Sequence, residues 1–381
     1  MKKTILNFYN YIRKLKIVLN IILITSLLFI SLNFILGWAW EIRTNLKFKN
    51  FKPYDDVVLA ALNLSQEDGL TLYLETFIDR KFDYEQFTEH AENSGYKNKF
   101  VNVTPQLGRK TISPENCKRN IFFYGGSTTF GYNVKDDQTI PSYLGKTLLK
   151  KKQEICVKNF GRGSYFSSQE NILFQKHILN KKIKPEDIII FLDGINENGN
   201  RNSRNTGFLF EVNRALNQDY WDMYKFTFPI FFDSLAINQF IKRVQQKYNL
   251  QKKTNLGQAS IFKPTDNLKH VYEKNILIRD GICKNLNLHC YSFLQPFATI
   301  HGKYFEKPTL GAIENRVLNV SEDKELKEKY KILSETKNII DIANSLEDTI
   351  FLSYVDGVHY SPLANEKISN KIYSIILDKL N

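Results

Sequence analysis

The chain has 381 residues, of which 43% are hydrophobic and 13% aromatic, so it can bury an extensive core and is not disordered over most of its length. Its formal net charge of +13 raises the question of a nucleic-acid partner. The basic residues are spread along the whole chain, however, and neither an arginine-rich arm nor a basic–aromatic RNA motif accompanies them. We therefore expect no nucleic acid among its partners and relate the charge to an anionic polymer or lipid surface.

Residues 17–40 contain no charged residue. As a helix this stretch spans about 36 Å, enough for a hydrocarbon core of about 30 Å. Trp38 and Trp40 lie at the end of this stretch, where aromatic belts form. The basic residues that precede it are Lys2, Lys3, Arg13, Lys14 and Lys16. The positive-inside rule then leaves residues 1–16 in the cytoplasm and everything after Glu41 outside.

Two alternatives to a membrane anchor are open. A cleaved signal peptide would have a shorter apolar core and a small-residue exit, which "LGWAWE" at 36–41 matches poorly. A buried globular helix would show a polar face, and this stretch has only scattered Asn, Ser and Thr. We expect a retained signal anchor in the cytoplasmic membrane, with the rest of the chain periplasmic or extracellular.

The four cysteines fit an oxidising compartment. Cys117 lies just before one strand-like run and Cys156 starts another. If those strands are parallel neighbours, their starts are adjacent and a Cys117–Cys156 disulfide is geometrically possible. Cys283 and Cys290 are then the second pair. Four cysteines allow three connectivities, and four buried free thiols are the alternative.

The chain changes character along its length. Residues 41–115 are mixed in pattern, and we treat them as a membrane-proximal segment with little that resembles chemistry. From 116 to 381, strands alternate with helices. The predicted elements are a strand at 120–125, a helix at 140–152, a strand at 155–160, a helix at 167–182, a strand within 185–194, an inserted cap at 197–270, a strand within 288–296, a helix at 322–346, a strand within 349–361 and a helix from Pro362.

Continuous apolar runs such as Ile188–Leu192 are typical of parallel strands that are covered on both faces. Strands that alternate with helices favour an open α/β sheet with right-handed crossovers. The region at 197–270 is too long for a simple connection, and this predicts a cap or lid. We expect a three-layer α/β/α sandwich preceded by a transmembrane helix.

Open α/β sheets place their sites at the carboxyl ends of the strands. Each predicted strand exit carries small or polar groups. They are Gly125-Gly126-Ser127 in "YGGST", 159–164 in "NFGRGS", 194–197 in "GINE" and 356–359 in "DGVH".

Together these exits supply the roles that acyl transfer needs. Ser127 would be the nucleophile, although its block alone is better explained as a strand that ends in a capped turn. His359 would take its proton and Asp356 would orient the imidazole. The oxyanion needs donors. The candidates are the backbone N–H groups of Ser127 and of the Gly163-Ser164 turn, and the Asn196 side chain. Arg162 and Glu197 are candidates for substrate contact, Arg162 toward an anionic group.

This combination resembles the SGNH, or GDSL-type, hydrolase family. Its blocks match in the family's order at "GGST", "NFGRGSYFSSQE", "DGINE" and "DGVHYS", over 119–196 and 350–376. Gly126 stands where many members carry Asp, which is not one of the family's four catalytic groups. Ser164 falls where the oxyanion glycine usually lies. Its backbone N–H can still donate, and Gly163 is the alternative donor.

The resemblance implies a flavodoxin-like α/β/α sandwich and no metal or organic cofactor. Together with the predicted anchor, it leads us to expect a membrane-anchored extracytoplasmic serine esterase that hydrolyses O-acyl esters, such as O-acetyl groups, of an envelope glycan or lipid through an acyl-serine intermediate. Two other functions are open. The same residues can serve an O-acyltransferase, in which a glycan hydroxyl replaces water. A non-catalytic envelope protein that binds or assembles glycans could also keep the fold.

Overall fold

The computed structural model describes residues 2–49, 51–80, 82–92, 95–104, 108–114, 117–197, 235–238, 240–241, 267–298 and 320–380. The chain divides into two units. The first comprises residues 1–51 and 202–261, and the second comprises 52–201 and 262–381. Most of the cap predicted at 197–270 lies outside the described residues.

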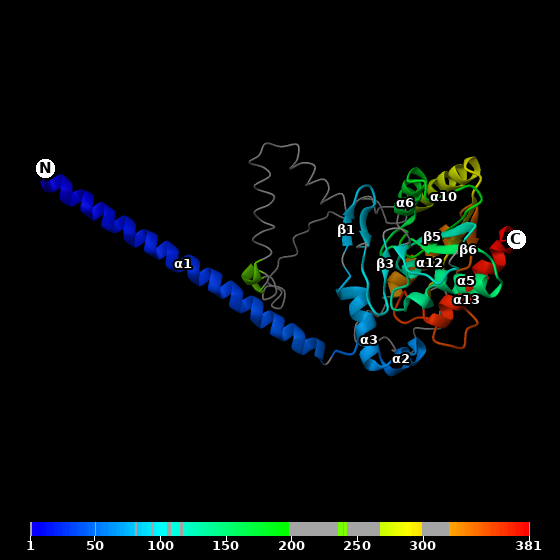
Figure 1. The fold of residues 1–381 in the computed structure, drawn as a ribbon, viewed down its shortest axis with the longest axis horizontal. Coiled ribbons are helices and arrows are strands. Elements are labelled where there is room, and N and C mark those ends of the chain that lie inside the picture. Colours follow the sequence, from blue (N-terminus) through cyan, green and yellow to red (C-terminus); the bar gives the residue numbers. More distant parts are fainter. Residues whose placement is uncertain are drawn as a thin grey trace. The chain divides into compact units, whose positions relative to one another are not determined.

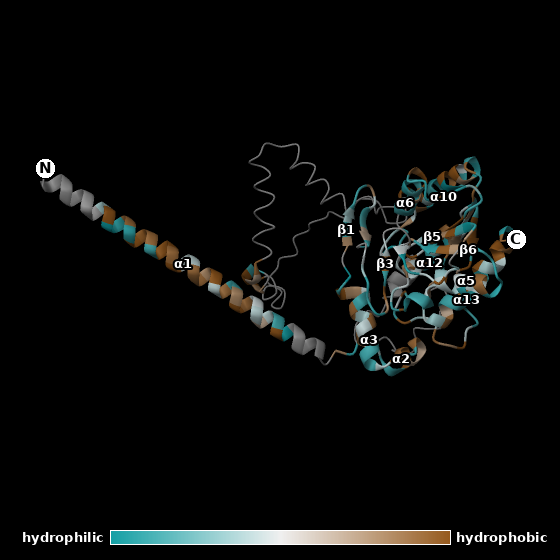
Figure 2. Ribbon diagram, viewed as in Figure 1, coloured by the Kyte–Doolittle hydropathy of each residue, from teal (hydrophilic) through white to brown (hydrophobic). Residues whose placement is uncertain are grey.

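The described part of the first unit is mainly the helix α1 (Lys2–Lys49). Its stretch Tyr11–Arg43 is long and apolar enough to cross a membrane, and none of the most apolar window is buried. Figure 2 shows the apolar residues along the middle of this helix. A signal sequence near the N-terminus can meet the same criteria of length and apolar composition, so the helix agrees with either kind of segment.

The second unit is built on a seven-stranded sheet in the order β3-β4-β6-β5-β7-β8-β9. The strands are β3 (Val103–Thr104), β4 (Gly108–Arg109), β5 (Arg119–Gly125), β6 (Ile155–Asn159), β7 (Ile188–Asp193), β8 (His289–Leu294) and β9 (Ile339–Asp341). All neighbouring pairs are parallel except β3 with β4. The five parallel strands β5 to β9 lie side by side in the order β6-β5-β7-β8-β9. Numbered from 1 to 5 along the chain, this is the order 2-1-3-4-5 of a flavodoxin-like sheet.

Helices cover both faces of this sheet, so the predicted three-layer arrangement is confirmed (Figure 1). Because side chains alternate along a strand, Ile121 and Phe123 of β5 face one side and Phe122 and Tyr124 the other. The first face packs against the helices α5 (Ile140–Lys150) and α13 (Pro362–Ile376). The second packs against α6 (Ser167–Leu179) and α10 (Leu268–Asn285), with α12 (Val320–Ser334) beside α10.

The sheet begins before residue 116, where the sequence predicts its boundary, because β3 and β4 lie at 103–109. Before them come α2 (Asp56–Leu62), α3 (Gln66–Tyr73), the π-helical turn η1 (Leu74–Ile78), β1 (Phe82–Glu85) and β2 (Glu89–Glu92). This segment shares a core with the loops after β5, in which Tyr54 and Leu62 meet Phe130 and Val134. Two-residue strands are too short to show a periodicity, so the sequence pattern does not reveal them.

Two predicted elements near the C-terminus are wrong. The helix expected over 322–346 ends at Ser334, and β9 lies within the remainder. The stretch 349–361, read as a strand, is a described loop closed by one bridge between Tyr354 and Tyr360. Aromatic and β-branched residues suit a strand in pattern, but here they fill a core from a loop.

The cysteines are joined as Cys117–Cys156 and Cys283–Cys290. The first bridge links the chain just before β5 to the start of β6, whose residues lie in parallel register. The second links the end of α10 to β8. Each bridge thus ties a strand start to the element beside it.

Candidate active site

Ser127 is the first residue of α4 (Ser127–Phe130), a single turn that follows β5 directly. Gly126 precedes it with φ −82°, which any residue adopts. A Cβ at 126 would lie too close to the amide nitrogen of Asn196, so this amide would have to shift to accommodate a side chain. The tight junction brings a hydroxyl to the carboxyl end of β5, beside the ends of β6 and β7. That is the switch point where open α/β sheets bind ligands.

Ser127 belongs to a chain of two short hydrogen bonds. Its Oγ lies 2.8 Å from Nε2 of His359, and Nδ1 of His359 lies 2.6 Å from Oδ2 of Asp356. Because the Asp356 carboxylate accepts a hydrogen bond from Nδ1, the imidazole carries its proton on Nδ1. Nε2 is then able to accept a hydrogen bond from the Ser127 hydroxyl. This arrangement can activate a serine oxygen as a nucleophile.

The loop before α13 explains the spacing between Asp356 and His359. Oδ1 of Asp356 accepts hydrogen bonds from the backbone N–H groups of Val358 (2.8 Å) and His359 (2.7 Å), which folds the loop back on the carboxylate. Burial alone would raise the pKa of Asp356. The electrostatic attraction and hydrogen bond of His359, together with these N–H donors, outweigh burial and hold that pKa below its ordinary value. The carboxylate is therefore ionised at neutral pH.

A second donor reaches Asp356 from the loop after α4. Nδ2 of Asn133 donates to Oδ2 of Asp356 (2.6 Å), and the hydroxyl of Tyr54 donates to Oδ1 of Asn133 (2.6 Å). Asn133 is buried and has φ 63°, in the left-handed region where Asn is tolerated. The hydrogen-bonded chain therefore extends from Ser127 through His359, Asp356 and Asn133 to Tyr54.

The imidazole is also held on its face. The ring of Tyr132 stacks on that of His359, and the Tyr132 hydroxyl accepts a hydrogen bond from Arg80. The side chain of Arg80 is only 3% exposed, and its Nε lies 3.1 Å from Oε2 of Glu92. Arg80 and Glu92 thus support His359 through Tyr132, and both come from the segment before the sheet.

The expected oxyanion donors differ in the hydrogen bonds that they already make. Nδ2 of Asn196 donates to the carbonyl of Tyr165 (2.9 Å), and a second N–H remains on this amide. The N–H of Gly163 is bonded to Oε1 of Glu92 (3.3 Å), so it is committed elsewhere. Ser164 has φ 63°, and its backbone N–H follows in the same turn. The N–H of Ser127 opens α4, where helical N–H groups have no intrahelical partner.

The two residues considered for substrate contact are held by neighbouring groups. Arg162 donates to Oε2 (2.7 Å) and Oε1 (3.3 Å) of Glu85, and also to the hydroxyl of Tyr165 (2.7 Å). Glu197 is buried and accepts from the N–H (2.7 Å) and the hydroxyl (2.6 Å) of Ser167. Burial raises its pKa to about 7. Glu197 therefore supports the start of α6, and Arg162 the loop after β6.

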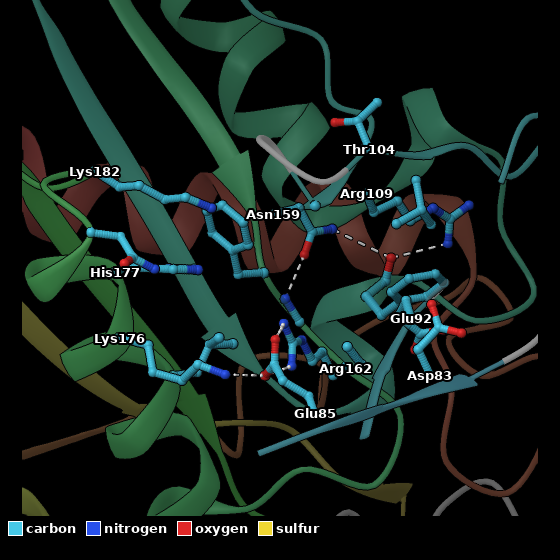
Figure 3. A pocket seen from close by; sticks show the side chains of 18 residues that line it. Asp83, Glu85, Glu92, Thr104, Arg109, Asn159, Arg162, Lys176, His177 and Lys182 are labelled. Atoms are coloured by element: carbon cyan, nitrogen blue, oxygen red, sulfur yellow. Dashed lines mark hydrogen bonds and ion pairs between the residues drawn. The ribbon is translucent and has the colours of Figure 1, made fainter. Parts of the chain in front are cut away.

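A cavity of about 250 Å³ lies near this loop and is lined by residues of β1, β2, β3, β4, β6, α4 and α6. Neither Ser127 nor His359 lines it. Figure 3 shows Glu85 between Arg162 and Lys176, with both of which it forms an ion pair. The cavity is therefore a polar space behind the loop that follows β6, separate from the Ser127 hydroxyl.

Sequence reasoning missed the residues that surround the Ser–His–Asp chain. Tyr54, Arg80 and Glu92 lie in a segment without recognisable motif, and Tyr132 and Asn133 follow the serine block but belong to no motif. The one available signal was the polar and aromatic run "FGYN" at 130–133, directly after the single turn that carries Ser127. Distances between segments far apart in sequence leave no other trace in a single chain.

No family model matches the chain, and no curated protein matches it. Solved structures do. A lipase/acylhydrolase from Enterococcus faecalis is 13% identical, with 69% of this chain and 98% of that chain covered and a TM-score of 0.37. A protein from Desulfitobacterium hafniense assigned to the G-D-S-L family of lipolytic proteins is 14% identical over 68% and 99%, with a TM-score of 0.34. An acetyl xylan esterase from Geobacillus stearothermophilus is 12% identical over 70% and 95%, with a TM-score of 0.35.

The solved structures that this chain resembles thus include members of the group whose motifs its sequence resembles. At these identities and TM-scores the likeness carries no argument about chemistry. The described part of the molecule defines a flavodoxin-like α/β/α protein with a Ser–His–Asp chain at the carboxyl edge of its sheet. What that site does follows from its own geometry.

Proposed function

We propose that this protein is a serine esterase that hydrolyses O-acyl esters. The observation that carries the proposal is the distance of 2.8 Å between Ser127 Oγ and His359 Nε2, with His359 in turn 2.6 Å from Asp356. A base within hydrogen-bond reach of the hydroxyl is the first requirement for a serine nucleophile. A protein that only binds glycans would have no use for this alignment.

The reaction proceeds in two halves. Ser127 Oγ attacks the acyl carbon while its proton passes to Nε2 of His359. The tetrahedral oxyanion is held by the N–H groups of Ser127 and Ser164 and by the Asn196 amide. The C–O bond to the alcohol then breaks, and His359 returns the proton to the leaving oxygen. In the second half water attacks the acyl carbon and gives a proton to His359; the bond from that carbon to Ser127 Oγ then breaks, His359 returns the proton to Oγ, and the acid departs.

The helix α1 anchors the enzyme in the cytoplasmic membrane and places the sheet outside. Basic residues before the apolar stretch support this orientation, and the Cys117–Cys156 and Cys283–Cys290 bridges suit an oxidising compartment. The substrate is then an acylated glycan or lipid of the envelope, with an O-acetyl ester as the simplest case.

The test uses the full chain in detergent with p-nitrophenyl acetate and an O-acetylated polysaccharide. Wild-type protein should release acetate, and Ser127→Ala should reduce the rate by at least ~10³-fold. Ser374→Ala, at an exposed serine of α13, is the matched control and should leave the rate unchanged. Wild-type turnover equal to that of Ser127→Ala would refute the esterase. Transfer of labelled acetyl to an added glycan, in place of release to water, would instead identify an O-acyltransferase that uses the same site.

A further inference from the structure

The hairpin formed by β1 and β2 (Phe82–Glu92) pairs only with itself among the described strands and contacts the loop that follows β6. Both backbone groups of Gly163 bond to it. Nε2 of His90 lies 2.9 Å from the Gly163 carbonyl, and the Gly163 N–H donates to Oε1 of Glu92 (3.3 Å). A carbonyl only accepts, so His90 carries its proton at Nε2 in this contact. The hairpin therefore determines how the Gly163 backbone is turned.

This contact has a direct consequence for the next residue. The carbonyl of Gly163 and the N–H of Ser164 belong to one planar trans peptide unit, in which the two groups point in opposite directions. When His90 draws the carbonyl toward the hairpin, the Ser164 N–H is turned away from the hairpin. The left-handed conformation of Ser164, with φ 63°, is unfavourable for serine and needs support of this kind.

The residues on either side of Gly163 are tied to the same hairpin. Arg162 makes two hydrogen bonds to Glu85 of β1 and a third, of 3.2 Å, to the carbonyl of His90. The hydroxyl of Tyr165 donates to that same carbonyl. There is no room for a side chain at Gly163, since it would collide with the hydroxyl of Tyr132. The hairpin thus holds residues 162–165 of this loop by several hydrogen bonds, and these restrain rotation of the peptide units.

We propose that His90 and Glu92 are positioning residues that hold the Gly163–Ser164 peptide so that the Ser164 N–H serves as an oxyanion donor. Neither residue touches the reacting atoms; both act through the backbone of Gly163. The inference rests on the proposed esterase function and goes beyond it, because it assigns a role in the reaction to a hairpin outside the sheet.

Two substitutions distinguish the role of the His90 N–H donor from the role of its aromatic ring. His90→Phe keeps an aromatic ring against Phe82 and Tyr165 but removes the N–H, whereas His90→Gln keeps an N–H near the position of Nε2. With the full chain in detergent and p-nitrophenyl acetate, His90→Phe should lower kcat by about 10- to 100-fold with KM changed by less than about threefold. His90→Gln should recover kcat to within about threefold of wild type.

Hydrogen exchange supplies a readout that does not depend on turnover. Peptides that cover 160–166 should exchange at least about fivefold faster in His90→Phe than in wild type, while peptides of β5 and β7 stay unchanged. Unchanged exchange at 160–166 would contradict the proposal that His90 of the hairpin holds this loop. Faster exchange with an unaltered kcat would overturn its role in catalysis. If wild type shows no turnover that depends on Ser127, the esterase proposal fails, and the exchange result still decides whether the hairpin holds this loop.

Discussion

The ring of Tyr132 lies almost parallel to the imidazole of His359, with centroids 4.9 Å apart and planes inclined by 15°. The stack limits rotation of the base about its side-chain bonds and keeps Nε2 directed at Ser127. An aromatic pair of this kind contributes about 0.5–1.5 kcal/mol. The hydroxyl of the same tyrosine accepts from the buried Arg80, so its ring and its hydroxyl have separable roles.

Tyr132→Leu should therefore lower kcat by about three- to tenfold, since it removes the stack on His359. Tyr132→Phe keeps the ring and should leave kcat within about twofold. It leaves Arg80 without that acceptor and should lower the free energy of unfolding by about 1–3 kcal/mol. Steady-state kinetics and thermal unfolding of the full chain in detergent measure the two effects. The interpretation is contradicted if the leucine variant keeps full activity.

The link from Tyr54 to Asp356 predicts a graded loss. Asn133→Gly tolerates φ 63° but removes the donor to the carboxylate, and it should lower kcat about tenfold. Tyr54→Phe removes only the distal hydroxyl and should lower kcat about two- to threefold. Because Tyr54 acts through Asn133, the double variant should be no worse than Asn133→Gly. A simple product of the two single effects would show that Tyr54 acts independently.

Two substitutions introduce residues that the resembled family carries at these positions, and they should have different effects on kcat. Gly126→Asp puts a side chain into the space of the Asn196 amide, so kcat should fall at least about 100-fold. Ser164→Gly keeps the backbone N–H and relieves the left-handed conformation, so kcat should stay within about twofold. Both are measured with p-nitrophenyl acetate. Full activity of Gly126→Asp would mean that Asn196 does not need its observed position.

Acid should destabilise the protein through His177. Burial lowers the pKa of His177 to about 3, and its Nδ1 is bonded to the hydroxyl of Tyr124. Between about pH 6.5 and 3 the unfolded chain takes up a proton at this residue and the folded chain does not. Stability is therefore lost as the pH falls through this window, by about 2 kcal/mol between pH 7 and 5.

The control for this prediction is His177→Asn, which does not titrate. Glu197 works in the opposite direction, because its pKa is raised to about 7 and its contribution declines as the pH rises. Both proteins contain Glu197, so its contribution to the pH dependence cancels when their Tm values are compared. The difference in Tm between wild type and His177→Asn should shrink from pH 7 to pH 5. Parallel curves for the two proteins would disprove the assignment.

The two disulfides should differ in their effect on stability. Cys117–Cys156 closes a loop with a sequence separation of 39, and Cys283–Cys290 one of 7. Chain entropy predicts losses of about 4 and about 2 kcal/mol when each pair is replaced by serines. Thermal unfolding of the full chain in detergent compares them, and mass spectrometry after alkylation without reductant counts free thiols. Alkylation of any cysteine in wild type would contradict the pairing.

The sequence was sufficient for the long parallel strands and for the residues that end them. Runs such as Ile188–Leu192 have only one good environment, a strand covered on both faces, and their exits then meet at one edge. The loop with Asp356 and His359 was located although it is not a strand, because the i, i+3 spacing comes from a local turn around the carboxylate. Local chemistry of this kind leaves a readable pattern.

What could not be predicted depends on contacts between distant segments. β3 and β4 are too short to show alternation, and β9 is hidden in a stretch that continues a helical pattern. The strand-exit pattern favours the Gly163 N–H as an oxyanion donor, but this N–H is bonded to Glu92, 71 residues earlier in the chain. Arg162 and Glu197 looked free to meet a ligand for the same reason, since a single sequence does not reveal their buried partners.

The early part of the second unit has a practical consequence for anyone who shortens this chain. A truncation at the first long strand, near residue 116, would delete two strands of the sheet together with Tyr54, Arg80 and His90. Such a fragment would keep Ser127, His359 and Asp356 and still lack the packing around them. Cutting between α1 and Lys52 removes the apolar helix and preserves every one of these supports.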